Sequence, residues 1–509
     1  MKHFGAAFLC VLLAFTAGAQ TNPSLVATNL VPNGRQMSMQ DCIQAALRQN
    51  LDVQIQRYNP EIDLYNLQAS YGAAYDPTLS ASGSHDFNVQ PGGFFDGIQL
   101  PSETTKEDQF SSGIKGELPV TGLQYDLSGN INQQHFLQLT NDLPDDTRNS
   151  GGSVGITLTQ PLLKNAWIDQ NRLTILINKN TLLYDEQGFR EQVITSVTAV
   201  ANAYYELIYA LENLKVQQEA LDLSQTQLDQ DKQRLQIGTL AQLSVQQDES
   251  QVAQNEANVI TAQSTLETDQ NTLKNLITDN YSELHNADIQ PKETLTAPLV
   301  LFDLQDSWSR GMTERPDLIQ YRLNVKRAGI QLKFDHNQLF PELDVIGTYG
   351  WNGDGQVYNG TIGQINQGNA PYYSIGGQFS MPLANLGARN QVKSDKVTLK
   401  QVVLKLKQYE QTVMVGIDNA VKTAQSDYES VDATRQARIY AEAALDAEQK
   451  TYAVGKATTF EVLTYQNSLT GARGQEIRAL ANYEEALANL YSQEGSTLDR
   501  LGINIEATP

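Results

Sequence analysis

Apolar residues recur at every seventh position over a long stretch in the first half of the chain. The series begins at Val193 and continues without a break to Leu235. Such a sustained seven-residue repeat is typical of a helix packed in a coiled coil. A second series runs from Val245 to Leu273, after an interruption at Gly238. The pattern therefore predicts two long antiparallel helices joined by a tip near this glycine.

The second half of the chain repeats this plan. Gly455 corresponds to Gly238. When the heptad positions are displaced by the offset between these two glycines, nine of the eleven from Ile417 to Leu490 are again apolar. A register kept over a whole hairpin indicates a tandem repeat, with twin tips at Leu235–Gln247 and Tyr452–Gln466.

Segments with alternating apolar and polar residues precede each long hairpin, and this alternation is typical of strands with one buried face. The loops predicted beyond the strands, at 91–105 and 352–369, are long and polar. The predicted strands lie at 78–89, in an extra hairpin at 110–132, at 154–158, at 342–351 and at 373–379.

Four strands, with an optional extra pair, are too few to close a barrel, because the smallest membrane barrels have about eight. Open sheet edges are unsatisfied in lipid, so we expect self-association. With three copies, four strands each would give a twelve-stranded barrel above a twelve-helix tube. Trp167 is expected at the periplasmic rim of this barrel or at its joint with the helices.

The N-terminus predicts export. Lys2 and His3 precede an apolar run from Phe4 to Phe15, and Ala17-Gly-Ala19 is typical of a cleavage site. Cleavage there would leave Cys42 as the one remaining cysteine, so no intrachain disulfide is expected. We expect Cys42 to be a small apolar residue on a helix face.

The composition favours neither nucleic acid nor catalysis. A net charge of −22 argues against a polyanionic partner. The five histidines are scattered without metal-ligand spacing, and no nucleophile elbow or phosphate loop is present. We therefore predict no enzyme activity, no cofactor and no metal site.

Taken together, the repeat, its motifs and their order resemble the outer-membrane efflux protein family, the TolC-like outer-membrane factors. The resemblance covers essentially the whole mature chain. It depends on three paired motifs: Asp76-Pro-Thr-Leu-Ser80 with Phe340-Pro-Glu-Leu343, Thr159-Gln-Pro-Leu162 with Ser380-Met-Pro-Leu383, and Ile237-Gly238 with Val454-Gly455.

This resemblance implies a homotrimeric channel-tunnel, in which a helical barrel crosses the periplasm and continues into a transmembrane β-barrel in outer-membrane lipid. Its tips would contact a periplasmic adaptor (membrane fusion) protein and, through it, an inner-membrane pump of the RND, ABC or MFS type. The expected function is a passive exit duct for efflux or type I secretion. The sequence does not identify the cargo. The alternative function is a non-conducting coiled-coil oligomer that spaces the envelope.

The resemblance also implies a gate beside the second tip. Tyr452 matches the family's tyrosine before the tip, and Glu461 matches the first of its acidic aperture positions. Thr464, at the second position, is not acidic, and Ala457 stands where the family's latch has an arginine. For Glu461, a solvated helix carboxylate is a comparable interpretation.

The tips themselves are the candidate surface for adaptor docking, although packing in the core is an alternative for their apolar residues. The docking candidates are Ile237, Gly238, Leu240, Val454, Gly455 and Phe460.

The predicted organisation follows the repeat. It comprises a signal peptide (1–19), an N-terminal arm (20–37), repeat 1 (38–280), a linker (281–305), repeat 2 (306–500) and a C-terminal tail (501–509).

Overall fold

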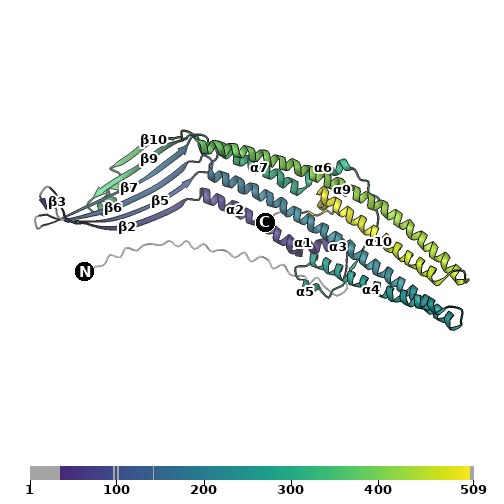
Figure 1. The fold of residues 1–509 in the computed structure, drawn as a ribbon. Helices are drawn as coiled ribbons and strands as arrows, with labels where there is room; N and C mark the ends of the chain where they lie inside the picture. The colour runs from purple at the N-terminus through teal and green to yellow at the C-terminus, as the bar shows by residue number, and fades with distance from the viewer. Residues whose placement is uncertain (1–34, 96–97, 100–101, 141–142, 505–509) are drawn as a thin grey trace.

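The computed structural model describes residues 35–95, 98–99, 102–140 and 143–504. The molecule is elongated, with a β-sheet at one end and long helices that run from it to two tips at the other end (Figure 1). The predicted signal peptide and most of the N-terminal arm lie outside the described residues.

One antiparallel sheet of six strands forms the first end of the molecule, in the order β10-β9-β7-β6-β5-β2. The strands are β2 (Thr78–Gln90), β5 (Glu103–Glu117), β6 (Gln124–Thr140), β7 (Leu143–Pro161), β9 (Glu342–Gly355) and β10 (Pro371–Ser380). The two edge strands, β2 and β10, each pair on one side only within the described residues.

The predicted extra hairpin at 110–132 corresponds to β5 and β6, which are longer than expected and lie inside the sheet. Because β5 pairs with β2 and β6 pairs with β7, the hairpin lies between β2 and β7. The sheet therefore has six strands per chain, because the optional extra pair belongs to it.

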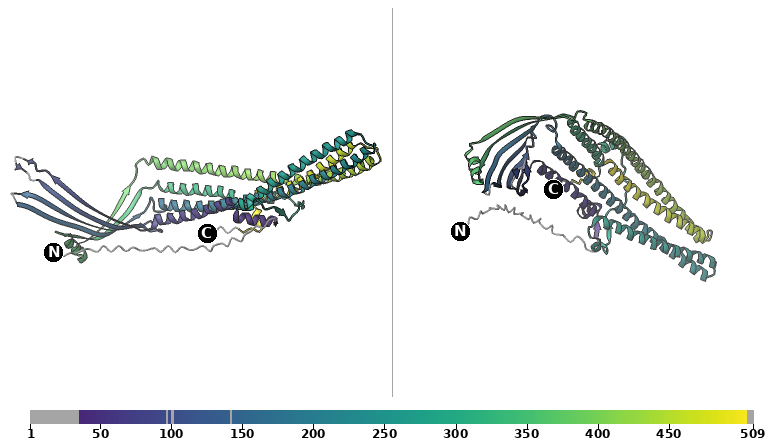
Figure 2. Two further views of the ribbon diagram at one scale, coloured as in Figure 1. Left: turned by 90° about the horizontal axis from the view of Figure 1, so that it is seen from below. Right: turned by 60° about the vertical axis from the view of Figure 1, so that its left-hand side comes forward.

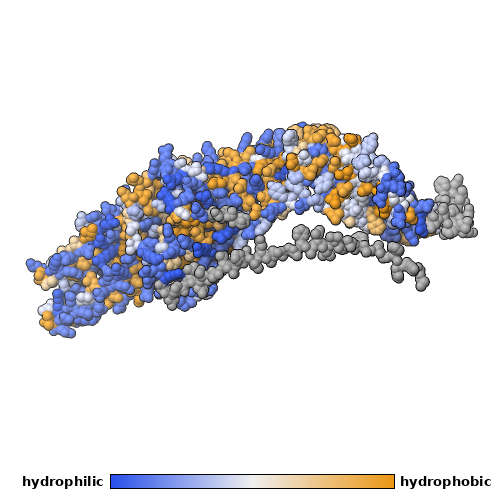
Figure 3. Space-filling model, turned by 180° about the vertical axis from the view of Figure 1, so that it is seen from behind, coloured by the Kyte–Doolittle hydropathy of each residue, from blue (hydrophilic) through white to orange (hydrophobic). Residues whose placement is uncertain are grey.

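The two faces of the sheet differ in chemistry, because side chains alternate along each strand. The face called here the apolar sheet face is largely exposed in the single chain, and Figure 3 shows orange residues gathered over part of the sheet and its joint with the helices. Its large exposed members are Leu79, Phe87, Val89, Phe110, Ile114, Leu127, Ile156, Leu158, Val345, Tyr349, Tyr373, Ile375 and Phe379.

The opposite face carries mainly Ser, Thr, Asn, Asp and Gln. Ser82 bonds to Ser111 across the β2–β5 pair, and Ser153 bonds to Asn130 across the β6–β7 pair. A sheet with one apolar and one polar face can separate lipid from water.

Helices continue the sheet in a single layer. Next to it, α2 (Leu51–Tyr75), α3 (Gln170–Gln236), α7 (Pro316–Asn337) and α9 (Leu386–Ala453) lie side by side in that order. Farther out, α4 (Gln242–Ile277) returns along α3, and α10 (Thr459–Glu494) returns along α9. At 67 residues, α3 is about 100 Å long.

Short elements fill the middle of the molecule. A two-stranded parallel sheet joins the end of the N-terminal arm to the linker between the repeats. These elements are β1 (Arg35–Met37), α1 (Met39–Gln49), α5 (Tyr281–Leu284), β8 (Ile289–Pro291), α6 (Leu304–Glu314) and α11 (Thr497–Arg500), and the strand loop holds β3 (Phe94–Phe95) and β4 (Ile98–Gln99).

The heptad positions form the core, as the spacing predicted. Val193, Val200 and Leu207 are almost completely buried and pack with Leu273 of the return helix. Cys42 of α1 is buried in the same cluster, so it is the small apolar residue that was expected.

Two helical stretches, at 39–75 and 304–337, are each divided by a break. The first breaks at Asn50, whose side chain caps α2 by accepting a hydrogen bond from the Val53 amide at 3.1 Å. The second breaks at Arg315, directly before Pro316, because the residue before a proline disfavours helical backbone.

The predicted loop at 352–369 was wrong over most of its length. Strand β9 extends to Gly355, and α8 (Tyr358–Gln367) then lies against the sheet. Glycine at 353 and 355 leaves room for this close approach, since a Cβ at Gly353 would lie 2.3 Å from the Thr361 carbonyl oxygen. The Thr361 hydroxyl also donates to the Ser150 carbonyl at 2.9 Å.

Among the described residues, no helix is both long enough and apolar enough to cross a membrane.

Candidate functional site

The two tips have the same backbone geometry. Gly238 and Gly455 have φ angles of 78° and 75°, in the left-handed region that favours glycine. In the first tip the Thr239 amide donates to the Arg234 carbonyl at 2.9 Å, and in the second the Lys456 amide donates to the Thr451 carbonyl at 3.1 Å. These bonds link corresponding positions of the two repeats and satisfy the last carbonyls of each helix.

Apolar side chains project from both tips into solvent. Ile237, Val454 and Phe460 are 74%, 69% and 64% exposed. Leu240 differs, because it packs partly into the cluster around Val245. Core packing is thus the local role of Leu240, whereas the other three remain available for contact with a partner.

A buried polar cluster joins the two hairpins just behind the tips, which lie at the end of the molecule farthest from the sheet (Figure 2). We call Asp231, Asp248, Tyr452 and Thr459 the tip cluster. The Tyr452 hydroxyl lies 2.8 Å and 2.7 Å from the two carboxylate oxygens of Asp231, and the Thr459 hydroxyl donates to Asp231 at 3.2 Å. Asp231 belongs to α3 of the first hairpin, whereas Tyr452 and Thr459 belong to the second, so these bonds tie the hairpins together.

Asp231 has further support from its own helix. The Gln227 side-chain amide donates to it at 3.0 Å, and the Arg234 guanidinium lies 3.6 Å away. The same guanidinium lies 4.6 Å from the ring centroid of Tyr452. Although the arginine of the family's latch is missing at Ala457, a cation still reaches this tyrosine from α3.

Asp248 is the least satisfied member of the tip cluster. It is 0% exposed, and neither of its carboxylate oxygens has a hydrogen-bond partner among the described residues. Burial, and next the nearby charge of Asp231, raise the pKa of Asp248 to about 7. The tip cluster therefore gains or loses a proton near neutral pH.

Replacing Asp248 by asparagine is expected to remove a pH dependence of tip stability. Between its usual pKa of 3.8 and about 7, the folded state binds this proton more strongly than the unfolded state. Stability is therefore greatest at low pH and falls as the pH rises to about 7. At pH 8 the variant should raise the free energy of tip opening by about 1–2 kcal/mol.

Hydrogen exchange of the tip amides at pH 5 and pH 8, corrected for intrinsic rates, measures this effect. A pH-dependent protection in the wild type that persists unchanged in Asp248→Asn would contradict the assignment.

Glu461 closes a local capping box. Its carboxylate accepts from the Thr458 amide at 2.7 Å, and its own amide donates to the Thr458 hydroxyl at 3.3 Å. The bond from the Thr458 amide lowers the pKa of Glu461, whose side chain faces solvent. Capping is thus an observed role of this residue, and its place in a gate stays a prediction.

Four residues of the site were missed from the sequence, and one of them is Thr459 of the tip cluster. Asp231 and Asp248 sit inside heptad helices, where a buried acid is unexpected, and that mismatch was the available signal. Leu243 is 65% exposed at the first tip and is the counterpart of Phe460 in the first repeat. The repeat offset would have identified it.

Where the structure describes the chain, no cluster of three His, Cys, Asp or Glu side chains could hold a metal ion.

The chain is similar to known envelope proteins. A family model described as outer membrane efflux protein matches residues 122–278 and 310–496. The outer membrane protein TolC of Escherichia coli K12 is 26% identical over 307 residues, which cover 59% of this chain and 62% of that protein. The outer membrane efflux protein BepC of Brucella suis is 21% identical over 356 residues, which cover 70% and 74%. The match thus spans about three fifths of the TolC relative.

Solved structures share the fold. The outer membrane protein VceC of Vibrio cholerae superposes with a TM-score of 0.65 at 17% identity, covering 90% of this chain and 96% of that chain. The CmeC outer membrane channel of Campylobacter jejuni gives a TM-score of 0.64 at 14% identity, covering 90% and 86%. The predicted architecture, with long helical hairpins that continue into an antiparallel sheet in a tandem repeat, is confirmed.

Proposed function

Because the chain belongs to the outer membrane efflux protein family, we propose that it forms the exit duct of a tripartite efflux or type I secretion assembly. The family places the chain in the outer membrane. In the proposed arrangement the sheet lies in the lipid bilayer, and the helices extend into the periplasm. The duct is passive, and a partner pump supplies the energy.

The observation that carries this proposal is the sheet. Its apolar face exposes a band of large side chains, including Phe87, Tyr373 and Ile375, which are stable in lipid but not in water. Its edge strands have unpaired backbone groups, which lipid does not tolerate. Pairing of β2 with β10 of a neighbouring copy removes both edges and closes a ring.

A homotrimer is the assembly that the family resemblance implies. The polar sheet face would then line a water-filled lumen that continues between the helices. An envelope spacer that does not conduct would require neither this face nor the exposed apolar band, so the duct explains the sheet better.

Tripartite function requires that the helical tips contact other proteins. Ile237, Val454 and Phe460 are exposed apolar side chains at the end farthest from the sheet, where a periplasmic adaptor would dock. Burial of each such side chain provides about 1.5–3 kcal/mol. We therefore expect these residues to be central to docking, with Gly238 and Gly455 providing the turn.

Photo-cross-linking in cells tests the docking. A benzophenone amino acid placed at Phe460 should cross-link to a protein that mass spectrometry identifies as a periplasmic adaptor. Combining Ile237→Glu with Val454→Glu should lower the yield at least fivefold, because two charges would have to be desolvated in the interface.

The matched control carries the benzophenone at Phe94, which is 78% exposed in a strand loop at the opposite end. It should give no adaptor product. The docking proposal fails if position 460 cross-links only to copies of this chain, or if the two glutamates leave the yield unchanged.

A further inference from the structure

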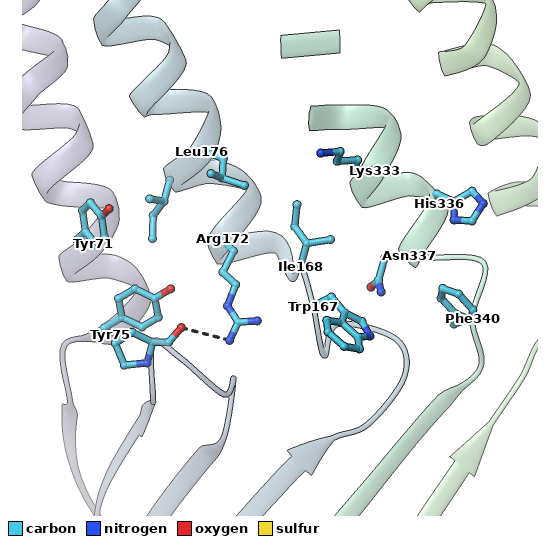
Figure 4. Close-up of a pocket in the computed structure, with 12 residues that line it drawn as sticks. Tyr71, Tyr75, Trp167, Ile168, Arg172, Leu176, Lys333, His336, Asn337 and Phe340 are labelled. Atoms are coloured by element: carbon cyan, nitrogen blue, oxygen red, sulfur yellow. Dashed lines mark hydrogen bonds between the residues drawn. The ribbon is translucent and has the colours of Figure 1, made fainter. Parts of the chain in front are cut away.

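A pocket of about 640 Å³ lies where the sheet meets the helices (Figure 4). The end of α2, the start of α3 and the end of α7 form its walls, and the turn between β5 and β6 contributes Pro119. Neither the tip cluster nor the duct proposal uses this pocket. We call it the joint pocket.

The joint pocket is lined mainly by apolar and aromatic side chains. Tyr71 and Tyr75 come from α2, Trp167 precedes α3, and Phe340 follows α7. Trp167 is 80% exposed and Phe340 is 45% exposed. Rings of this kind, apolar with a polar tip in Tyr and Trp, are stabilised at the boundary between lipid and water.

Cationic groups stand around the apolar lining. Arg172 is held in place, because its guanidinium donates to the carbonyls of Ala166 at 2.9 Å and Pro119 at 3.3 Å (dashed line in Figure 4 for Pro119). On the α7 side, Lys333 and His336 are exposed. No hydrogen bond or ion pair with the described residues engages the Lys333 ammonium, so it is available to an anion.

The pocket lies at the end of the sheet from which the helices extend. A second hollow is lined by Ala73 and Asp76 of the α2 end together with strand residues of the polar face, such as Asp126. Tyr75 lies two positions from Ala73, so the two side chains project from nearly opposite sides of the helix. The joint pocket and this hollow thus meet the end of α2 from different sides.

The pocket is centred on α3, inside the layer of helices. The layer order α2-α3-α7-α9 makes α2 and α9 the edges of the chain. The pocket lies around α3 and between α2 and α7, away from the α9 edge.

We propose that the joint pocket binds an anionic phospholipid of the bilayer. One acyl chain lies among Tyr75, Trp167 and Phe340, and the phosphate lies toward Lys333 and His336. This inference assumes the outer-membrane location of the proposed function, and it adds a specific lipid ligand that holds the sheet-to-helix joint at the level of the headgroups.

Quenching of Trp167 fluorescence tests the proposal. Replacing Trp308 and Trp351 by phenylalanine leaves Trp167 as the sole tryptophan in the mature chain. The purified trimer in detergent is titrated with phosphatidylglycerol or phosphatidylcholine, each brominated at the same acyl carbons. Quenching by phosphatidylglycerol should saturate at a mole fraction at least fivefold lower than quenching by phosphatidylcholine.

Lys333→Gln combined with His336→Gln should abolish this difference between the lipids. Lys326→Gln, which removes an exposed charge elsewhere on α7, should preserve it. Native mass spectrometry of the unmodified protein gives a second measurement, with anionic lipid retained by the wild type and lost from the double variant.

Two results would overturn the proposal. Quenching that rises without saturation and equally for both lipids indicates an ordinary lipid annulus. Absence of quenching by either lipid indicates that another part of the chain covers Trp167. Conductance of the same preparations distinguishes failure of the lipid proposal from failure of the duct proposal. A channel that conducts but shows no lipid selectivity contradicts the lipid site alone.

Discussion

Replacing Tyr452 by phenylalanine is expected to raise the conductance of the reconstituted channel at least several-fold. The Tyr452 hydroxyl is within hydrogen-bonding distance of both oxygens of Asp231, a carboxylate that is 0% exposed. Without the Tyr452 hydroxyl, the buried Asp231 carboxylate loses a hydrogen-bond donor, which destabilises the closed tips by about 1–3 kcal/mol. Splaying the hairpins exposes Asp231 to water and relieves that cost, so the variant favours the open tips.

The size of the effect follows from the energy, since about 1.4 kcal/mol changes an equilibrium tenfold. The ratio of open to closed tips should therefore rise by about five- to a hundredfold. Recordings from planar bilayers measure it as open probability and mean current.

Tyr440→Phe is the matched control, because Tyr440 lies on the same helix and is 70% exposed. It should behave like the wild type. If Tyr452→Phe also conducts like the wild type, the bonds between Tyr452 and Asp231 do not hold the tips closed.

The second large effect concerns the bore of the channel in the membrane. Removing residues 103–140, which contain β5 and β6, is expected to lower the conductance of the Tyr452→Phe channel by about half. The tip variant is used so that the tips no longer limit the current. Loss of six strands from a trimer reduces eighteen strands to twelve, and barrel diameter grows roughly linearly with strand number.

The widths of the two layers explain why six strands fit this chain. Strands lie about 4.8 Å apart and tilt by about 40° in barrels, so six of them span about 37 Å around the circumference. Helices pack about 9 Å apart, so the four columns α2, α3, α7 and α9 span about 36 Å. Four strands would cover only about 25 Å. The six-stranded sheet therefore lets the lumen continue through the joint without narrowing.

The deletion retains antiparallel pairing, because β2 and β7 run in opposite directions once β5 and β6 are removed. Trimers that resist detergent at room temperature and dissociate on heating serve as the folding control. An unchanged conductance in folded trimers would show that β5 and β6 do not widen the bore. If the deletion variant forms no trimers, the full chain provides a second test. Disulfides engineered between β2 and β10 of neighbouring copies then measure closure of the barrel.

The sequence predicted the helical hairpins well, because a coiled-coil core is encoded in a local period. Val193, Val200 and Leu207 could be assigned to one buried seam from their spacing alone. The constant offset between the two repeats predicted both tips, since Gly238 and Gly455 require the same left-handed turn.

The tip cluster could not be predicted in the same way. Tyr452 and Asp231 are 221 residues apart, and their contact depends on how two hairpins pack. Helix α8 was also missed, because its polar, glycine-containing sequence is typical of a loop, and the sheet beneath it provides the stabilising contacts. The lengths of β5 and β6 were underestimated, because the polar start of β5, near Glu103, shows little alternation.

The most direct test of the duct is the single-channel conductance of the wild-type protein purified from outer membranes. The account predicts trimers that dissociate on heating and that insert into planar bilayers with one uniform conductance step. A monomer that remains in the soluble periplasmic fraction and gives no conductance would contradict it.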